Sequence, residues 1–216
     1  MRILFLGDSI TDMCRQRDVA DNIIFTYGHG HPFFVAEKLF KKDPSAYSII
    51  NHGIGGDRSI DMLIRMGQKS IDVKKVEPDV VSILIGINDV WRKYDSPKDA
   101  ICVEDYEKNF RKILEQIRHD APNAKIIINE PFVLRASATT NNWAGFSADT
   151  KAFAYVAKKL SEEFGVYFLP LQNVLDEAAE KYGSRYVLSD GVHPDVLGAS
   201  IIADEWMKLF ETEIEK

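Results

Sequence analysis

Cysteine is scarce in this sequence, and the two cysteines present lie far apart. Cys14 and Cys102 form no Cys-x-x-Cys motif and have no histidine partners at the spacing of zinc ligands. His29 and His31 lie two residues apart, but they have no nearby third ligand. We therefore expect reduced thiols, no disulfide framework, no metal site and no cofactor that depends on one.

An excess of positive charge and long hydrophobic runs are also missing. The chain has 27 lysines and arginines against 33 aspartates and glutamates, a net charge of -6. Because binding to nucleic acid depends on clustered cations, this balance argues against a nucleic-acid partner. No apolar run reaches the length of a membrane span, and the apolar start at residues 3–6 is too short for a secretory signal. We expect a cytoplasmic protein without a membrane partner.

The composition is that of a globular protein. Hydrophobic residues make up 45% of the 216 residues and charged residues 28%, which argues against disorder. A chain of this length can build one substantial core but is short for two. We expect a single domain over residues 1–216, with no internal repeat or linker.

Five short apolar runs predict the strands of one sheet. They are continuously hydrophobic, as expected of strands covered by helices on both faces. The runs cover residues 3–6, 47–50, 80–85, 125–128 and 166–169. Residues 60–64, 106–117 and 153–160 between them repeat apolar side chains at helical spacing, and Gly165 stands where a C-cap glycine is expected. This alternation predicts an α/β fold, a three-layer α/β/α sandwich around a five-stranded parallel sheet.

Two long connections are predicted to build a pocket. Residues 11–32 and 132–150 are long for simple links, and loops at the C-terminal edge of a parallel sheet usually shape the binding site. Trp143 in the second connection is a candidate lid residue. Pro194 suits the first turn of the last helix, which would hold His193 at the N-terminal boundary of that helix.

Polar residues follow the predicted strands at the points where each strand ends. Ser9 lies in a Gly-Asp-Ser-Ile-Thr-Asp run after the first strand, and Gly56 and Asn88 follow the second and third strands. Asp190 and His193 lie three residues apart before the last helix. A serine hydroxyl, an imidazole and a carboxylate are the groups needed to make an activated nucleophile. The sequence therefore predicts a hydrolytic site at the edge where open α/β sheets bind ligands.

Four motifs in this order resemble those of the SGNH hydrolases, the GDSL-type esterase superfamily. The motifs are Gly-Asp-Ser-Ile, Asn-x-Gly-x-x-Gly, Gly-x-Asn-Asp and Asp-x-x-His-Pro, and together they span nearly the whole chain. The resemblance implies the SGNH hydrolase fold, with a flavodoxin-like five-stranded parallel sheet. It also implies a serine esterase that uses no cofactor and assembles as a homo-oligomer.

The resemblance implies a role for each motif residue. Ser9 would attack the ester carbonyl, His193 would act as base and acid, and Asp190 would orient the imidazole. The oxyanion would be met by the backbone N–H groups of Ser9 and Gly56 and by the side-chain amide of Asn88.

A narrower resemblance concerns the substrate. Residues 82–95 are similar to the corresponding stretch of bacterial intracellular acetylxylan esterases, which implies removal of acetyl groups from carbohydrate esters such as acetylated xylo-oligosaccharides. Candidate substrate-binding residues are Asp12, Trp91, Tyr94 and Trp143, and Trp91 could offer its ring face to a sugar or simply pack under the loop. These esterases carry a tryptophan before the catalytic aspartate, where this chain has Ser189. This difference weakens the assignment of the substrate but not that of the catalytic residues.

Other functions remain open at this stage. A lysophospholipase or thioesterase would share the chemistry but would need an apolar channel for a long acyl chain. A phosphate- or flavin-binding flavodoxin-like module shares the sheet layout, although the chain has no Gly-x-x-x-x-Gly-Lys-Ser/Thr loop. A sugar-binding protein that has lost catalysis is a third alternative, and the intact set of catalytic residue types argues against it.

Overall fold

The fold is built on one parallel sheet. The structure, a computed structural model, describes residues 1–215. The strands are β1 (Arg2–Gly7), β2 (Ser48–Asn51), β3 (Val80–Leu84), β4 (Lys125–Asn129) and β5 (Tyr167–Leu169). They pair in the order β2-β1-β3-β4-β5, and every pair is parallel. This confirms the predicted five strands, with ends shifted by one residue in most cases, and the flavodoxin-like order.

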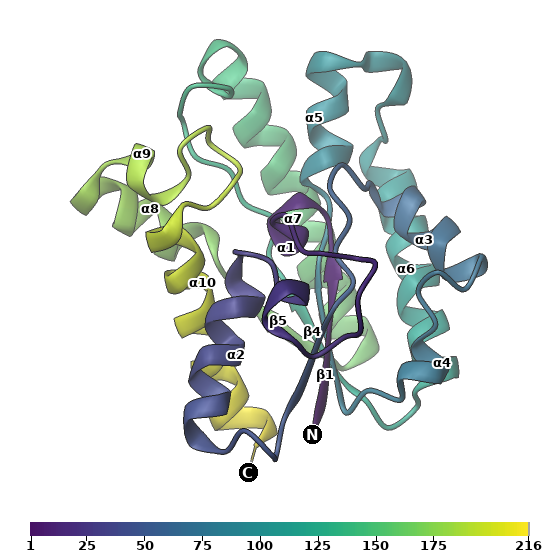
Figure 1. Cartoon of the computed structure of the whole chain (residues 1–216). Helices are drawn as coiled ribbons and strands as arrows, with labels where there is room; N and C mark the ends of the chain where they lie inside the picture. Colours follow the sequence, from purple (N-terminus) through teal and green to yellow (C-terminus); the bar gives the residue numbers. More distant parts are fainter. Residues whose placement is uncertain (216) are drawn as a thin grey trace.

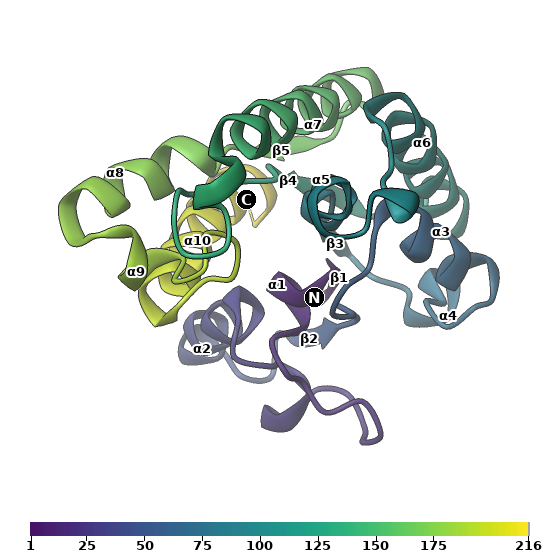
Figure 2. The same ribbon diagram turned by 90° about the horizontal axis from the view of Figure 1, so that it is seen from above.

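Helices cover both faces of the sheet. The elements are α1 (Ser9–Asp12), α2 (His31–Lys42), α3 (Ser59–Gly67), α4 (Val73–Val76), α5 (Ile87–Asp95), α6 (Val103–Asp120), α7 (Trp143–Phe164), α8 (Gln172–Tyr182), α9 (Ser184–Val187) and α10 (Val196–Leu209), with short turns η1 (Ile24–Thr26), η2 (Pro97–Asp99), η3 (Thr140–Asn142) and the π-helical η4 (Phe210–Ile214). Helices α2 and α10 pack together on one face, and α3, α6 and α7 pack in sequence on the other (Figures 1 and 2). The predicted three-layer α/β/α sandwich is thereby confirmed.

The core explains why the strands read as continuous apolar runs. All five residues of β3 are buried, because helices cover both of its faces. The helices predicted over 60–64, 106–117 and 153–160 are α3, α6 and part of α7. Gly165 ends α7 in the left-handed conformation, with φ of 60°, as expected of a C-cap glycine.

The two long connections are shorter than the sequence indicated. Residues His31 and Pro32 already belong to α2, and α7 begins at Trp143, so the predicted loop over 132–150 was wrong beyond residue 142. The reason is the buried face of α7, where Phe146, Thr150 and Phe153 recur at helical spacing and pack toward the core. Trp143 therefore stands in the first turn of a long helix, not in a loop.

The last helix also begins later than predicted. Helix α10 starts at Val196 with Asp195 as its N-cap, so Pro194 is not in its first turn. Pro194 instead forms an antiparallel bridge with Leu188, and the N–H of Asp195 donates to the carbonyl of Val187 at 3.0 Å. This pairing closes a loop that holds residues 189–193 before the helix starts.

The parallel strands bring the predicted site residues to one edge. The strand order reverses direction between β1 and β3, and ligands of open α/β sheets bind at such a crevice beyond the C-terminal strand ends. Ser9 follows β1, and Asn88 follows β3 in the first turn of α5. Within residues 1–215, no helix is both long enough and apolar enough to cross a membrane.

Candidate active site

Ser9, His193 and Asp190 form a continuous hydrogen-bonded chain. Ser9 is the first residue of α1, and the Asp8 carboxylate caps this turn by accepting the N–H of Ile10 at 2.9 Å. The Oγ of Ser9 lies 2.8 Å from Nε2 of His193, and Nδ1 of His193 lies 2.6 Å from Oδ2 of Asp190. The structure thus brings together three residues that span 184 positions of sequence.

The Asp190 loop holds its carboxylate in one orientation. Oδ1 of Asp190 accepts the backbone N–H groups of Val192 and His193, both at 2.8 Å, which leaves Oδ2 for the imidazole. Gly191 between them has φ of 101°, a conformation that L side chains rarely adopt. A tight glycine turn therefore aims the carboxylate at the imidazole of the same loop.

Electrostatics in this chain favour an ionised aspartate and a basic imidazole. Burial alone would raise the pKa of Asp190, but the hydrogen bonds from His193 and the backbone outweigh burial and lower this pKa to about 2. The hydrogen bond to Asp190 raises the pKa of His193, and partial burial opposes that shift. The imidazole can therefore accept a proton from Ser9 and hold it beside a negative charge.

The three donors predicted to meet the oxyanion lie on α1, on the loop between β2 and α3, and on α5. Gly56 has φ of 86°, and a Cβ on the preceding Gly55 would lie 3.8 Å from the Cβ of Ser9, so this loop passes close to the serine. Within residues 1–215 the backbone N–H groups of Ser9 and Gly56 have no hydrogen-bond partner. The Nδ2 of Asn88 donates to the carbonyl of Asp57 at 3.0 Å, which orients the amide and leaves its second hydrogen free.

Asp12 lies at the far end of the same short helix and is almost buried. Its Oδ2 accepts the N–H of Gly55 at 3.0 Å and a hydrogen bond from Arg17, and Arg15 stands 3.6 Å from Oδ1. Its side chain is 7% exposed. The carboxylate predicted to bind substrate is thus bonded to groups of the protein.

The predicted aromatic residues form a connected row beside the imidazole. The ring of Trp91 lies 6.3 Å from that of His193 and 5.8 Å, edge-on, from that of Phe146. Tyr94 stacks on Phe146 at 4.2 Å, and its hydroxyl donates to Asp149 at 2.6 Å. Sequence reasoning missed Phe146 in this row, although the spacing from Phe146 to Phe153 is helical and could have indicated it.

A polar and aromatic pocket continues this row. The pocket, of about 470 Å³, is lined by Tyr94, Arg135, Thr140, Asn141, Asn142, Trp143, Ala144 and Gly145. The segment that contributes Arg135 and Thr140 to the wall is bonded to the Asp190 loop through the backbone. The N–H of Leu134 donates to the carbonyl of Gly191 at 2.8 Å, and the N–H of Ala138 donates to the carbonyl of Asp190 at 3.0 Å. Tyr94 and Trp143 therefore line one pocket, with the amides of two asparagines beside them, and the wall of this pocket is bonded to the loop that carries Asp190 and His193.

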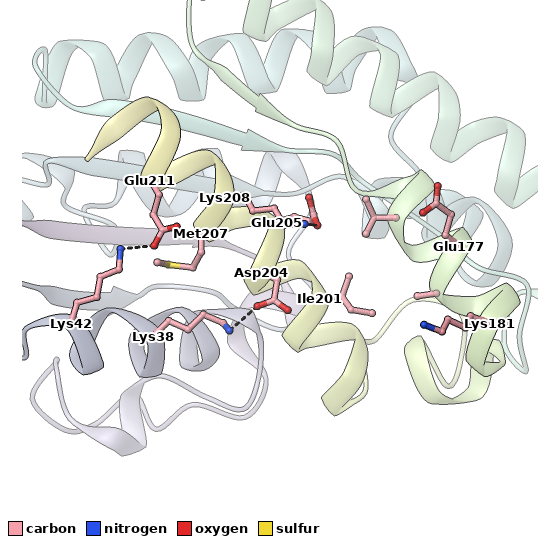
Figure 3. Close-up of a pocket in the computed structure, with 12 residues that line it drawn as sticks. Lys38, Lys42, Glu177, Lys181, Ile201, Asp204, Glu205, Met207, Lys208 and Glu211 are labelled. Atoms are coloured by element: carbon pink, nitrogen blue, oxygen red, sulfur yellow. Dashed lines mark hydrogen bonds and ion pairs between the residues drawn. The ribbon is translucent and has the colours of Figure 1, made fainter. Parts of the chain in front are cut away.

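A further hollow is lined by charged side chains around a few apolar ones. A groove of about 610 Å³ runs between α2, α8 and α10 over Ile201 and Met207. Its charged side chains pair with one another, as Lys38 does with Asp204 at 2.7 Å and Lys42 with Glu211 (Figure 3). Within residues 1–215 no group of three or more His, Cys, Asp or Glu side chains is arranged to hold a metal ion.

Comparison with known proteins places the chain in a family. The model of the GDSL-like Lipase/Acylhydrolase family matches residues 5–201. The acetylxylan esterase of Geobacillus stearothermophilus is 30% identical over 212 residues, which cover 96% of this chain and 92% of that protein. A human isoamyl acetate-hydrolyzing esterase 1 homolog is 24% identical over 227 residues, covering 99% of this chain and 82% of the relative.

Solved structures agree with this placement. A GDSL-like lipase from Parabacteroides merdae superposes with a TM-score of 0.88 and 37% identity, covering 96% of this chain and 94% of that one. The Geobacillus acetylxylan esterase superposes with a TM-score of 0.85 and 29% identity, covering 98% of this chain and 94% of that one. Variants of that esterase in which a serine or an aspartate is replaced by alanine are described as catalytic mutants.

Sequence motifs, sheet order and similarity over almost the whole chain all lead to one assignment. This protein belongs to the GDSL-like lipase/acylhydrolase (SGNH) family and is a carboxylic ester hydrolase.

Proposed function

We propose that the protein is a serine esterase that removes acetyl groups from carbohydrate esters, such as acetylated xylo-oligosaccharides, through an acyl-enzyme on Ser9. The observation that carries the mechanism is the hydrogen-bond chain from Ser9 Oγ through His193 to Asp190. A hydroxyl is a weak nucleophile until a base takes its proton, and an imidazole oriented by a carboxylate is suited to that task.

Acylation begins when Ser9 Oγ attacks the acetyl carbonyl carbon and His193 Nε2 takes the hydroxyl proton. The carbonyl electron pair moves to its oxygen, which the N–H groups of Ser9 and Gly56 and the amide of Asn88 stabilise. The intermediate then expels the sugar oxygen, which receives the proton from His193. The acetyl group remains on Ser9.

Deacylation repeats these steps with water. His193 takes a proton from the water as its oxygen attacks the acetyl-serine carbonyl, and the same three donors stabilise the second oxyanion. Collapse breaks the bond to Oγ, and His193 returns the proton to Ser9. Each turnover consumes one water and yields one free hydroxyl on the sugar and one acetate.

The pocket lined by Tyr94 and Trp143 supports a sugar as the alcohol part of the ester. Trp143 and Tyr94 offer aromatic surface, and Asn141, Asn142 and Arg135 offer donors and acceptors for hydroxyl groups. Both named relatives act on acetate esters according to their names, one of xylan and one of isoamyl alcohol. The cytoplasmic location, the homo-oligomer and the single domain stay predictions.

The rival functions differ in how well they fit. Membership of an ester hydrolase family argues against a flavin- or phosphate-binding module and against a sugar-binding protein that has lost catalysis. A lysophospholipase or thioesterase stays within the family but would favour long acyl chains. An acetyl esterase acting on apolar alcohols is the nearer rival, given the isoamyl acetate-hydrolyzing relatives.

The test measures acetate release from p-nitrophenyl acetate, acetylated xylo-oligosaccharides and isoamyl acetate, with wild type beside Ser9→Ala. Ser45→Ala, at an exposed serine that bonds to Asp43, is the matched control and should keep full activity. We expect activity on the oligosaccharides that disappears with Ser9→Ala. Activity on the other two esters alone would overturn the assignment of a sugar substrate. A higher rate on p-nitrophenyl esters of longer acyl chains, measured in parallel, would overturn the preference for acetyl groups. Activity that survives Ser9→Ala would overturn the assignment of the nucleophile.

A further inference from the structure

Two loops meet around Asp12, and each approaches it through a glycine. A Cβ on Gly28 would overlap the Asp12 carbonyl oxygen, and a Cβ on Gly53 would overlap its backbone nitrogen. Gly55 donates its N–H to the Asp12 carboxylate at 3.0 Å. Asp12 thus joins the loop after β1 to the loops that precede α2 and α3.

The loop between β2 and α3 carries Gly56, whose N–H faces the reactive serine in the proposed mechanism. Three hydrogen bonds of 3.0 Å hold this loop. Its carbonyls at Gly53 and Asp57 accept from the side chains of Arg15 and Asn88, respectively. Its N–H at Ile54 donates to the carbonyl of Gly7. Asp12 supplies a further hold, on the Ile54–Gly55 peptide, which is next to the peptide that carries the Gly56 N–H. Two consecutive glycines have wide backbone freedom, so without this hold the Gly56 peptide can turn its N–H away.

We propose that Asp12 is a positioning residue: through its bond to the Gly55 N–H it aims the neighbouring Gly56 N–H at the oxyanion. Ser9 and Asp12 are three residues apart in one helical turn, so both side chains lie on the same side of α1. One short helix therefore places the nucleophile and anchors the loop that stabilises the charge it creates. This differs from the expectation that Asp12 binds substrate directly, and it rests on the serine mechanism proposed above.

Burial makes Asp12 suited to this task. Its carboxylate is 7% exposed and is flanked by Arg15 and Arg17, so it is a charged acceptor for the Gly55 N–H in a site with little water. Oxyanion stabilisation depends on donors that are already in place when charge develops. A group that limits the motion of a donor therefore affects the transition state more than the ground state.

The experiment compares Asp12→Ala, Asp12→Asn and the control Asp18→Asn, an exposed carboxylate on the same loop. Rates on p-nitrophenyl acetate are divided by the concentration of active serine, titrated with diethyl p-nitrophenyl phosphate. We expect Asp12→Ala to lower kcat about 10- to 100-fold with KM nearly unchanged, less than the loss of a donor outright. Asp12→Asn retains an oxygen acceptor for Gly55 and should stay within about threefold of wild type.

Inhibition by phenylboronic acid, which forms a tetrahedral adduct on serine, separates positioning from folding. Its inhibition constant should rise in Asp12→Ala by the same factor by which kcat/KM falls. The proposal is overturned if Asp12→Ala keeps wild-type kcat, if it raises only KM for the oligosaccharide, or if Asp12→Asn is as slow as Asp12→Ala. Ser9→Ala is measured in parallel. Residual activity in Ser9→Ala would contradict the serine mechanism itself and would not bear on the role of Asp12.

Discussion

At the scale of single residues, the imidazole of His193 is the group whose protonation decides reactivity. Only its neutral form can take the proton of Ser9, and the adjacent Asp190 carboxylate stabilises its charged form. The hydrogen bond to Asp190 raises the pKa of His193 above the ordinary 6.5, although partial burial opposes this. The imidazole is therefore a stronger base than a free histidine. As the pH is lowered, however, it becomes protonated and unable to act as a base at a higher pH than a free histidine would.

This predicts the acid limb of the pH profile. As pH falls through the raised pKa, His193 takes up a proton, so kcat/KM should fall with a midpoint above pH 6.5. Asp190→Asn removes the charge that raises this pKa, so the midpoint should move to lower pH while kcat drops about 10³- to 10⁴-fold. The profile of p-nitrophenyl acetate hydrolysis from acid to neutral pH measures both effects.

A matched control lies on the same loop. Asp195→Asn neutralises an exposed carboxylate whose side chain makes no capping hydrogen bond, and it should keep the wild-type midpoint. An acid limb that stays in place in Asp190→Asn would contradict the assigned role of Asp190.

At the scale of elements, the start of α7 and the end of α5 together form one side of the pocket lined by Trp143 and Tyr94. Gly145 of α7 packs so closely on Tyr94 of α5 that a Cβ there would overlap the phenol. The stacked Phe146 and the bond from Tyr94 to Asp149 hold the two helices in register. Trp143 therefore stands on a rigid helical support, as the proposed contact with a sugar ring requires.

Trp143→Ala is expected to affect sugar substrates selectively. Loss of the ring removes aromatic surface from the pocket, so KM for acetylated xylo-oligosaccharides should rise about tenfold, equivalent to about 1.4 kcal/mol. Hydrolysis of p-nitrophenyl acetate, which is too small to fill the pocket, should change little. Tyr155→Ala, at a tyrosine of α7 that is 70% exposed, is the control. An equal loss on both substrates would mean that Trp143 supports the fold instead.

At the scale of the whole molecule, buried acids beneath the reactive edge make stability depend on pH. Asp8 is fully buried, and only one of its oxygens has a hydrogen-bond partner within residues 1–215. Burial raises the pKa of Asp8 to about 7, against 3.8 for a free aspartate, although the Ile10 N–H lowers it in part. Burial likewise raises the pKa of Asp89 to about 6. Each of these carboxyl groups contributes most to the free energy of unfolding at low pH, where it is protonated and neutral.

The contribution of Asp8 can be isolated with Asp8→Asn. Between pH 3.8 and about 7 the folded protein holds a proton on Asp8 that the unfolded chain has released, so the stability contributed by Asp8 falls as pH rises through this window. The slope is at most about 1.4 kcal/mol per pH unit. Asp8→Asn stays neutral and can still accept the Ile10 N–H, so it should gain stability over wild type more at pH 8 than at pH 5. Urea unfolding at both values measures this, with exposed Asp18→Asn as control, and an equal difference at both pH values would contradict it.

The sequence alone determined the fold class and the reactive set. Continuous apolar runs and helical spacing are local properties, so they predicted five strands and their covering helices without knowledge of distant contacts. Because parallel strands end at one edge, the polar residues after β1 and β3 were expected at that edge, and the motif before α10 added the carboxylate and the imidazole. Short motifs were therefore enough to predict the contact between Ser9 and His193 that the structure shows, while the place of Asn88 in the site stays a prediction.

Only the tertiary structure decided how these residues are held. The bond from Asp12 to Gly55, the row of rings from His193 through Trp91 and Phe146, and the pairing of Pro194 with Leu188 all join side chains or backbone far apart in sequence. No local pattern encodes such contacts, because each depends on where two loops meet after the core has packed. The start of α10 differed from expectation for the same reason, because the N–H of Asp195 bonds to the carbonyl of Val187 before the helix begins.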